Sequence, residues 1–152
     1  MNSEARPPLP DGPAVAPGGT NILVYSILDA ESKTLLTDKF ASISPPAWSE
    51  DGKQIAFVGL RENESTYRLF VVDTEGDNKL TEKLKNDVSY SPPCWAPCEK
   101  ILLFTSGASG NLLRRFDPAK SDALTPLPFS AVNVAEPAWS PDGKQIVFRC
   151  DR

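Results

Sequence analysis

The chain has 152 residues, with 16 basic and 20 acidic side chains, a net charge of −4 and no histidine. The acidic balance disfavours nucleic acid as a partner, because phosphate binding needs a basic surface, and the longest apolar run is far shorter than the roughly 20 residues of a membrane-spanning helix. The absence of histidine removes the commonest general base, the Ser-His-Asp arrangement and the usual zinc and copper sites.

Residues 1–20 differ in kind from the rest of the chain. They are rich in proline and glycine, and their few apolar side chains are scattered. We expect a disordered tail, or a linker to another domain, over 1–20 and the folded part over 21–152. Residues 1–20 also lack the charged start and apolar core of a secretory signal. The expected location is therefore the cytoplasm, or the periplasm if a signal has been lost upstream.

Three sequence elements recur in one order along residues 21–152, with a period of about 44 residues that marks a repeat architecture. The first is a strand-like run that ends in aspartate, at residues 25–29, 69–73 and 113–117. The second is a Leu-Thr pair that begins at Leu36, Leu80 and Leu124. The third is a longer motif around a tryptophan, at residues 46–57, 93–104 and 137–148, which contain Trp48, Trp95 and Trp139.

The tryptophan motif predicts a strand, a tight turn and a second strand. Its Asp-Gly pair favours a hairpin, because glycine accepts a positive φ without steric cost and aspartate tolerates it. The apolar runs at 55–58, 101–104 and 146–148 are continuous, which predicts burial on both faces between stacked sheets. The runs that end in aspartate predict third strands, and the Leu-Thr pairs predict short fourth strands. Four strands in about 44 residues are typical of a β-propeller blade.

The motif Pro-Ala-Trp-Ser-Pro-Asp-Gly-Lys-Gln-Ile-Val-Phe at 137–148 resembles the repeat of TolB-type, WD40-like β-propellers of bacteria. The aspartate and Leu-Thr elements resemble the rest of that unit. The resemblance implies an all-β fold of four-stranded antiparallel blades over residues 21–150. It does not specify one function, since such blades occur in periplasmic TolB, ahead of hydrolase domains in prolyl-oligopeptidase-like peptidases, and as sensor tails of bacterial regulators and kinases.

The predicted strands amount to a partial propeller. They give the outer half of one blade at 21–40, complete blades at 41–83 and 87–127, and the inner half of another blade at 131–150. About three blades are too few to close a ring, which takes roughly four to eight. Two outcomes stay open. Either the sequence is part of a longer chain, or two copies form a head-to-tail homodimer in which the half-blades of one copy pair with those of the other.

The three cysteines are the first candidates for chemistry. Cys94 takes the place of Ala47 and Ala138 beside the tryptophan, Cys98 replaces the turn aspartate, and Cys150 follows the last apolar run. In an extended hairpin, Cys94 and Cys98 lie too far apart for a disulfide, and an odd, scattered set suits a reducing compartment. We expect free, core-like cysteines, with a reactive thiol as the alternative.

Two further sets of polar residues have a structural and a functional interpretation. The Ser-Gly-Ala-Ser-Gly run at 106–110 does not fit the G-x-S-x-G nucleophile motif, and we expect a loop there. Asp29, Asp73 and Asp117 recur once per repeat, as residues that form turns do. The alternative is that these three carboxylates form a ring that binds an ion.

Two positions depart from the repeat. Glu99 takes the place of Gly52 and Gly143, so the middle hairpin needs a different turn. Arg115 takes the place of the apolar Val71. We expect its side chain to reach water near an outer edge, and the alternative is a buried arginine paired with a carboxylate.

No residue is assigned a catalytic, cofactor-binding or metal-binding role, and no cofactor is expected. The expected function is a non-enzymatic protein-interaction or scaffold module of the TolB type. It would bind a protein partner across polar loops at one end, such as residues 60–65, a step that rests on analogy of fold. The alternatives are a substrate-gating propeller of a prolyl-oligopeptidase-like hydrolase, a sensor tail of a bacterial regulator or kinase, and a degenerate remnant that does not fold stably.

Overall fold

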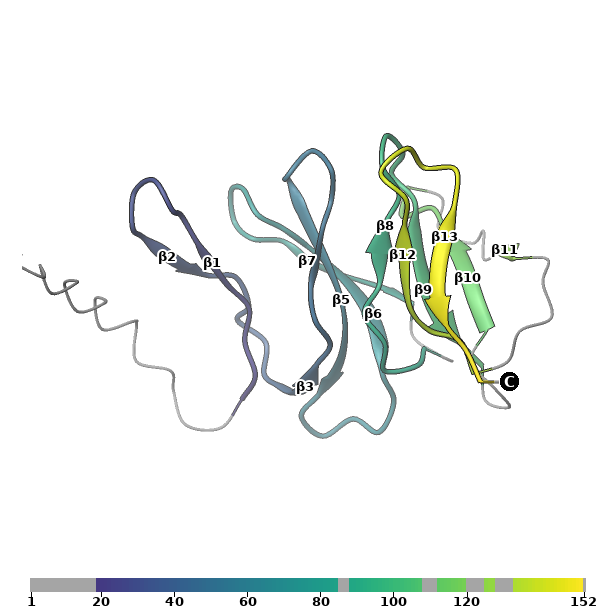
Figure 1. The fold of residues 1–152 in the computed structure, drawn as a ribbon. Helices are drawn as coiled ribbons and strands as arrows, with labels where there is room; N and C mark the ends of the chain where they lie inside the picture. Colours follow the sequence, from purple (N-terminus) through teal and green to yellow (C-terminus); the bar gives the residue numbers. More distant parts are fainter. Residues whose placement is uncertain (1–18, 85–87, 108–111, 120–124, 128–132, 152) are drawn as a thin grey trace, which may run out of the picture.

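The computed structural model describes residues 19–84, 88–107, 112–119, 125–127 and 133–151. Over these residues the chain forms thirteen strands in four antiparallel sheets, which stand side by side (Figure 1). The all-β prediction is therefore confirmed. Within the described ranges, no helix is long and apolar enough to cross a membrane. The predicted tail, apart from Gly19 and Thr20, and Leu124 of the third Leu-Thr pair lie outside the described residues.

The four sheets follow the order of strand groups that the repeat predicts. The first is a ribbon of β1 (Leu23–Tyr25) and β2 (Ser32–Thr34). The second contains β3 (Phe40–Ile43), β4 (Ala47–Trp48), β5 (Gln54–Arg61), β6 (Arg68–Asp73) and β7 (Leu80–Leu84). The third contains β8 (Cys94–Trp95), β9 (Leu102–Ser106), β10 (Leu112–Phe116) and β11 (Thr125–Pro126). The fourth is a hairpin of β12 (Ala135–Trp139) and β13 (Ile146–Arg149).

The paired strands β5 and β6 are buried on both faces, as the continuous apolar run predicts. The side chains of one face join the first ribbon and β3 in a cluster of Ile22, Leu35, Leu36, Phe40, Ile55, Phe57, Phe70 and Val72. The side chains of the other face join the third sheet in a cluster of Ala56, Val58, Leu69, Val71, Val88, Trp95, Leu102, Phe104 and Phe116. Successive residues of a strand point to opposite faces, so one strand pair contributes to two cores.

Three phenylalanines form the centre of the first cluster. The ring centroids of Phe40, Phe57 and Phe70 lie between 5.1 and 5.4 Å apart, and all three side chains are fully buried. Phe40 can approach β5 this closely because residue 59 is glycine: a Cβ atom on Gly59 would lie 2.9 Å from two ring carbons of Phe40. The aromatic cluster therefore holds β3, β5 and β6 together.

Burial on both faces is confirmed for the runs at 55–58 and 101–104 but is wrong for 146–148. Residues of those first two runs are at most 8% exposed, whereas Val147 is 68% exposed. The hairpin β12–β13 packs Ile146 and Phe148 against Leu103 of the third sheet. Its other face has no neighbouring sheet in the described part of the chain, which leaves Val147 in water.

The third strand predicted at 25–29 is also wrong in the first repeat. β1 ends at Tyr25, and the Ser26 N–H donates to the Glu31 carbonyl at 2.8 Å, which closes a turn. β2 then ends at Thr34, before the Leu-Thr pair. In the other two repeats the predicted third strands form, as β6 and β10, because β5 and β9 lie beside them and supply ladder partners. Among the described residues, the first ribbon has no such hairpin beside it.

We expect the Phe57→Ala variant to lose about 3–5 kcal/mol of the free energy of unfolding, because the deletion leaves a cavity in the aromatic cluster. Urea denaturation followed by fluorescence measures the change. Leu112→Ala is the control, because Leu112 is 37% exposed, and it should lose less than about 1 kcal/mol. Similar losses in the two variants would contradict the placement of the core.

Candidate functional site

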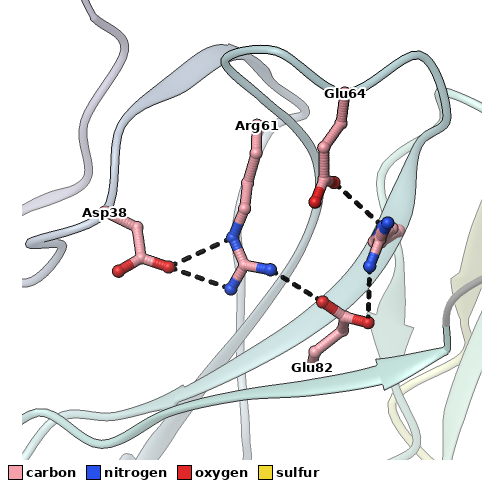
Figure 2. A network of polar contacts seen from close by, with 5 residues as sticks. Asp38, Arg61, Glu64 and Glu82 are labelled. Atoms are coloured by element: carbon pink, nitrogen blue, oxygen red, sulfur yellow. Dashed lines mark hydrogen bonds and ion pairs between the residues drawn. The ribbon is translucent and has the colours of Figure 1, made fainter.

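The polar loop that follows β5 stands on a network of five charged side chains (Figure 2). Arg61 donates through Nε and Nη2 to Asp38 Oδ2 at 3.1 and 2.9 Å, and through Nη1 to Glu82 Oε2 at 2.7 Å. The second Glu82 oxygen accepts from Arg68 Nη1 at 2.9 Å. Arg68 Nε lies 2.9 Å from Glu64 Oε2, as an ion pair without hydrogen-bond alignment. The network thus joins both ends of the loop to two other segments.

The strand ends place these side chains. Arg61 is the last residue of β5 and Arg68 is the first of β6, so the loop begins and ends in an arginine. Glu82 lies on β7, where it pairs with Phe70 of β6 and reaches both guanidinium groups. The Arg61 guanidinium carbon also lies 4.8 Å from the centroid of the Phe70 ring. The network therefore covers the end of the aromatic cluster.

The network holds three carboxylates and two guanidinium groups, so it carries one excess negative charge. Glu82 is its most buried member, with 14% of its side chain exposed, and both of its oxygens are engaged. Above this base, Asn63, Ser65 and Thr66 are exposed. Asn63 has a φ of 69°, a left-handed conformation that asparagine tolerates. The loop thus exposes short polar side chains and backbone groups, while the ion-pair network holds its two ends.

At the opposite end of β5, the first turn of the tryptophan motif has its own hydrogen bonds. The Ser49 hydroxyl donates to Asp51 Oδ1 at 2.7 Å, and the same oxygen accepts the Lys53 N–H at 3.1 Å. Gly52 takes a φ of 68°. The third turn repeats this pattern with Ser140, Asp142, Gly143 and Lys144, at 2.6 and 3.2 Å with a glycine φ of 69°.

These hydrogen bonds stabilise the ionised form of each turn aspartate. The Ser49 hydroxyl, followed by the Lys53 N–H, lowers the pKa of Asp51 to about 2. The Ser140 hydroxyl, followed by a backbone N–H, likewise lowers the pKa of Asp142. A carboxyl group with a lowered pKa is a poor general base near neutral pH. Both aspartates therefore act as turn-formers.

The middle turn differs, as the substitution of Glu99 for glycine predicts. Cys98 takes the positive φ, at 63°, and the Ile101 N–H donates to the Glu99 carbonyl at 2.9 Å. Glu50 of the first turn accepts the Cys98 N–H and lies 3.7 Å from its sulfur. Lys100 Nζ lies 3.3 Å from Asp51 Oδ2. These contacts tie the first turn to the middle turn.

A cavity of about 140 Å³ lies between these two turns. Its lining is polar apart from one tryptophan: Ser49, Glu50, Asp51, Trp95, Cys98, Glu99 and Lys100. Small-molecule sites usually measure roughly 300–1,000 Å³, so this cavity is too small for an organic substrate. Two larger hollows, of about 550 and 500 Å³, are lined without any carboxylate, lysine or cysteine.

All three cysteines are free, as predicted, but only one is core-like. Cys94 is half-buried, and burial raises its pKa to about 12. Cys98 and Cys150 are exposed. The core-like prediction is therefore wrong for these two, because Cys98 lies in the turn itself and Cys150 lies beyond the end of β13.

The three aspartates that end the first element do not come together. Asp73 accepts a hydrogen bond from Gln54 Nε2 at 2.8 Å, Asp29 from the Ser26 hydroxyl at 2.8 Å, and Asp117 from the Ala119 N–H at 3.0 Å. Each bond is local to one sheet or turn. Among the described residues, no group of three cysteine, aspartate or glutamate side chains gathers as metal ligands.

The remaining candidates have structural surroundings. Ser106 is buried at the end of β9, where its hydroxyl accepts from Arg114 Nε at 2.7 Å, and residues 108–110 lie outside the described residues. Arg115 has 48% of its side chain exposed and lies 3.4 Å from Glu99. It therefore reaches water, as predicted, although β10 is not an edge strand: β9 and β11 pair with it on its two sides.

The sequence predicts the polar loop at 60–65 but not the network beneath it. Asp38 and Glu82 lie 23 and 21 residues from Arg61, and only the pairing of the strands brings them together. The one available signal was an arginine at each end of a polar loop, between two apolar strands.

Comparison with known proteins identifies the architecture. No protein-family model matches the chain. It is 27% identical over 143 residues to YuxL, an uncharacterized peptidase of Bacillus subtilis, in an alignment that covers 68% of this chain and 21% of the peptidase. It superposes on TolB from Acinetobacter baumannii with a TM-score of 0.71 and 18% identity, over 84% of this chain and 31% of TolB. A TolB structure from Agrobacterium tumefaciens gives a TM-score of 0.63 and 19% identity, over 77% and 40%.

These similarities show a TolB-like β-propeller fold, as the tryptophan motif predicts. At 18% and 19% identity they show the fold alone. The chain spans about a fifth of the peptidase and well under half of each TolB structure.

We expect the Arg61→Lys variant to lose about 1–2 kcal/mol of the free energy of unfolding, because a lysine cannot reach Asp38 and Glu82 together. The control is Arg149→Lys, because Arg149 has 65% of its side chain exposed and lies 3.4 Å from Glu136. That variant should change stability by less than about 0.5 kcal/mol. Urea denaturation of both variants makes the comparison, and equally small losses would show that the network does not stabilise the loop.

We expect the Ser49→Ala variant to raise the pKa of Asp51 toward its usual 3.8, because the variant removes the strongest hydrogen bond to that carboxylate. The pKa of Asp51 is lower in the folded chain, so its hydrogen bonds stabilise the fold above about pH 4 and are lost as pH falls toward 2. As the pH falls from about 4 to 2, the free energy of unfolding should therefore decrease less in the variant than in the wild type. Carboxyl NMR titration measures the pKa, with Asp142 as an internal reference that should not move. An unchanged Asp51 would contradict the assigned cause.

Proposed function

We propose that this TolB-like propeller chain is a non-enzymatic module that binds a protein partner through the β5–β6 loop. The observation that supports this most is the ion-pair network, which anchors both ends of an exposed polar loop on a buried sheet. Binding residues are often carried on loops that a rigid scaffold positions. A fixed loop loses less conformational entropy on binding than a mobile one.

The chemistry of the chain favours binding over catalysis. The sequence has no histidine, which leaves no Ser-His or Cys-His pair. The half-buried Cys94 is the only cysteine near an apolar core, and its raised pKa keeps it a neutral thiol. The five charged side chains of the network form ion pairs with one another, so these groups already have partners within the chain.

The similarity to YuxL favours one alternative, a propeller that gates substrates for a peptidase. That protein is named a peptidase, and this chain aligns with about a fifth of it. In such a protein the partner of the propeller would be a catalytic domain. The two functions therefore differ in the partner of the loop: a catalytic domain for the gating function, and another protein for the scaffold function.

The cellular compartment of the protein is also part of what we propose. The comparisons give no support to the cytoplasmic location expected from the sequence, and similarity to TolB is compatible with the periplasmic alternative. Two exposed free cysteines, in contrast, suit a reducing compartment. Cell fractionation distinguishes the two locations.

Site-specific photocrosslinking in cells tests the binding loop. We expect a photoreactive phenylalanine analogue at Asn63 or Ser65 to give one discrete adduct, which mass spectrometry identifies. The matched control is Asp77, which is exposed in the turn at the opposite end of the same sheet and should give none. An adduct with a hydrolase domain supports the gating function, and one with another protein supports the scaffold. Equal adducts from the loop and from Asp77, or no adduct from the loop, would contradict a binding role for the loop.

A further inference from the structure

The five charged side chains of the network are not held equally firmly. Arg61 donates three hydrogen bonds, and its guanidinium carbon lies 4.8 Å from the centroid of the Phe70 ring. Both oxygens of Glu82 accept hydrogen bonds, one from each arginine. Arg68 donates through Nη1 to Glu82 at 2.9 Å, but its Nε faces Glu64 without hydrogen-bond alignment. The contact between Glu64 and Arg68 is therefore the weakest in the network.

Both atoms of this weak contact are buried. Arg68 Nε and Glu64 Oε2 lie 2.9 Å apart, and neither has a hydrogen-bond partner among the described residues. A buried donor or acceptor without a partner raises the free energy of a fold, because it has given up its hydrogen bonds to water. Glu64 belongs to the same short loop as Arg68, which limits how its carboxylate can turn. A carboxylate that is free to align with Arg68 therefore binds it better than Glu64 does.

Glu64 is also the member of the network that can leave most easily. The two arginines and Glu82 lie on strands, whereas Glu64 lies on the loop (Figure 2). Its side chain is 27% exposed, and its neighbours in the chain, Asn63 and Ser65, are exposed. A change of side-chain rotamer turns the carboxylate of Glu64 toward water, and no strand has to unpair.

Departure of Glu64 leaves a balanced base with one open position. The remaining carboxylates, Asp38 and Glu82, equal the two guanidinium groups in charge. Nη1 of Arg68 stays bonded to Glu82. Its Nε and Nη2 form the edge through which a guanidinium group binds a carboxylate with two parallel hydrogen bonds. The open position therefore fits one carboxylate, which restores the original charge of the network.

We propose that the partner of the β5–β6 loop supplies one carboxylate, which displaces Glu64 and binds Arg68 through Nε and Nη2. This inference rests on the binding function proposed above and names the chemistry of the partner. Glu64 is an internal ligand that covers the buried edge of Arg68 until the partner binds. The exchange conserves the number of ion pairs, and it gains the hydrogen-bond alignment that Glu64 lacks.

The charges that remain near Arg68 restrict what carries this carboxylate. Glu62 and the displaced Glu64 are both acidic and lie on the same loop. They repel a segment with many negative charges and attract a segment with positive ones. The partner segment that fits is therefore one acidic residue flanked by basic residues, and not an acidic tract.

NMR titration with sodium acetate tests the exchange on the chain alone. Acetate carries the single carboxylate that the open position fits, and the signal of the Arg68 Nε–H group reports its binding. We expect the Glu64→Ala variant to bind acetate about two to five times more tightly than the wild type, because the variant removes one partly exposed ion pair that competes for Arg68. Acetamide, which is neutral, should shift this signal in neither protein.

The matched control is Glu99→Ala, which removes the carboxylate that lies 3.4 Å from Arg115. The side chain of Arg115 is 48% exposed and that of Arg68 is 22% exposed, so the Arg115 guanidinium stays hydrated and gains little from acetate. The Arg115 Nε–H signal should respond equally weakly in this variant and in the wild type. Equal affinity of the wild type and Glu64→Ala for acetate at Arg68 would overturn the proposal.

Photocrosslinking from Asn63 in cells tests the exchange with the partner itself. We expect Arg68→Lys to reduce the yield of the adduct several-fold, because lysine cannot form two parallel hydrogen bonds to a carboxylate. Glu64→Ala should increase the yield, because no internal ligand has to be displaced. An adduct that is unchanged in Arg68→Lys would contradict the exchange and leave the binding function of the loop in place. Absence of an adduct in the wild type would contradict that binding function, and the acetate titration would still decide whether Arg68 exchanges Glu64.

Discussion

Burial of the β5–β6 pair on both faces is the constraint on which the rest of the structure depends. Ile55 and Phe57 pack toward the first ribbon, while Ala56 and Val58 pack toward the third sheet. Full burial of a valine, isoleucine or phenylalanine side chain contributes about 1.5–3 kcal/mol relative to an exposed one. A sheet of this kind is stable only between neighbours. In the described part of the chain the β12–β13 hairpin has a neighbouring sheet on one face, and Val147 on its other face is 68% exposed.

The ion-pair network follows from the same core. The aromatic cluster ends where β5 ends, and the Arg61 guanidinium covers Phe70 at that point. A partly buried cation needs charged partners, because its desolvation is otherwise uncompensated. Asp38 and Glu82 supply them through hydrogen bonds of 2.7–3.1 Å. The geometry of the exposed loop is therefore determined by the packing below it, which links the core to the surface.

The repeat predicted most of this fold, because its signals are local. The Asp-Gly turns form with φ near 68° at Gly52 and 69° at Gly143, and the absence of glycine in the middle turn moves the positive φ to Cys98. The network was not predictable in the same way. It depends on register shifts between β3 and β5 and between β6 and β7, which no spacing in the sequence records. The turn at Ser26 was missed because a strand forms only where a neighbour pairs with it.

The two surface features differ in what they depend on. The β5–β6 loop stands on a sheet whose strands β3 to β7 are already paired, and its ion pairs close within that sheet and the segment before β3. The edge of β13 and the exposed Ile27 and Leu28 are different, because their apolar side chains lower their free energy only when another strand covers them. The geometry of the loop is thus determined within one sheet, whereas Ile27, Leu28 and Val147 stay exposed in the described part of the chain.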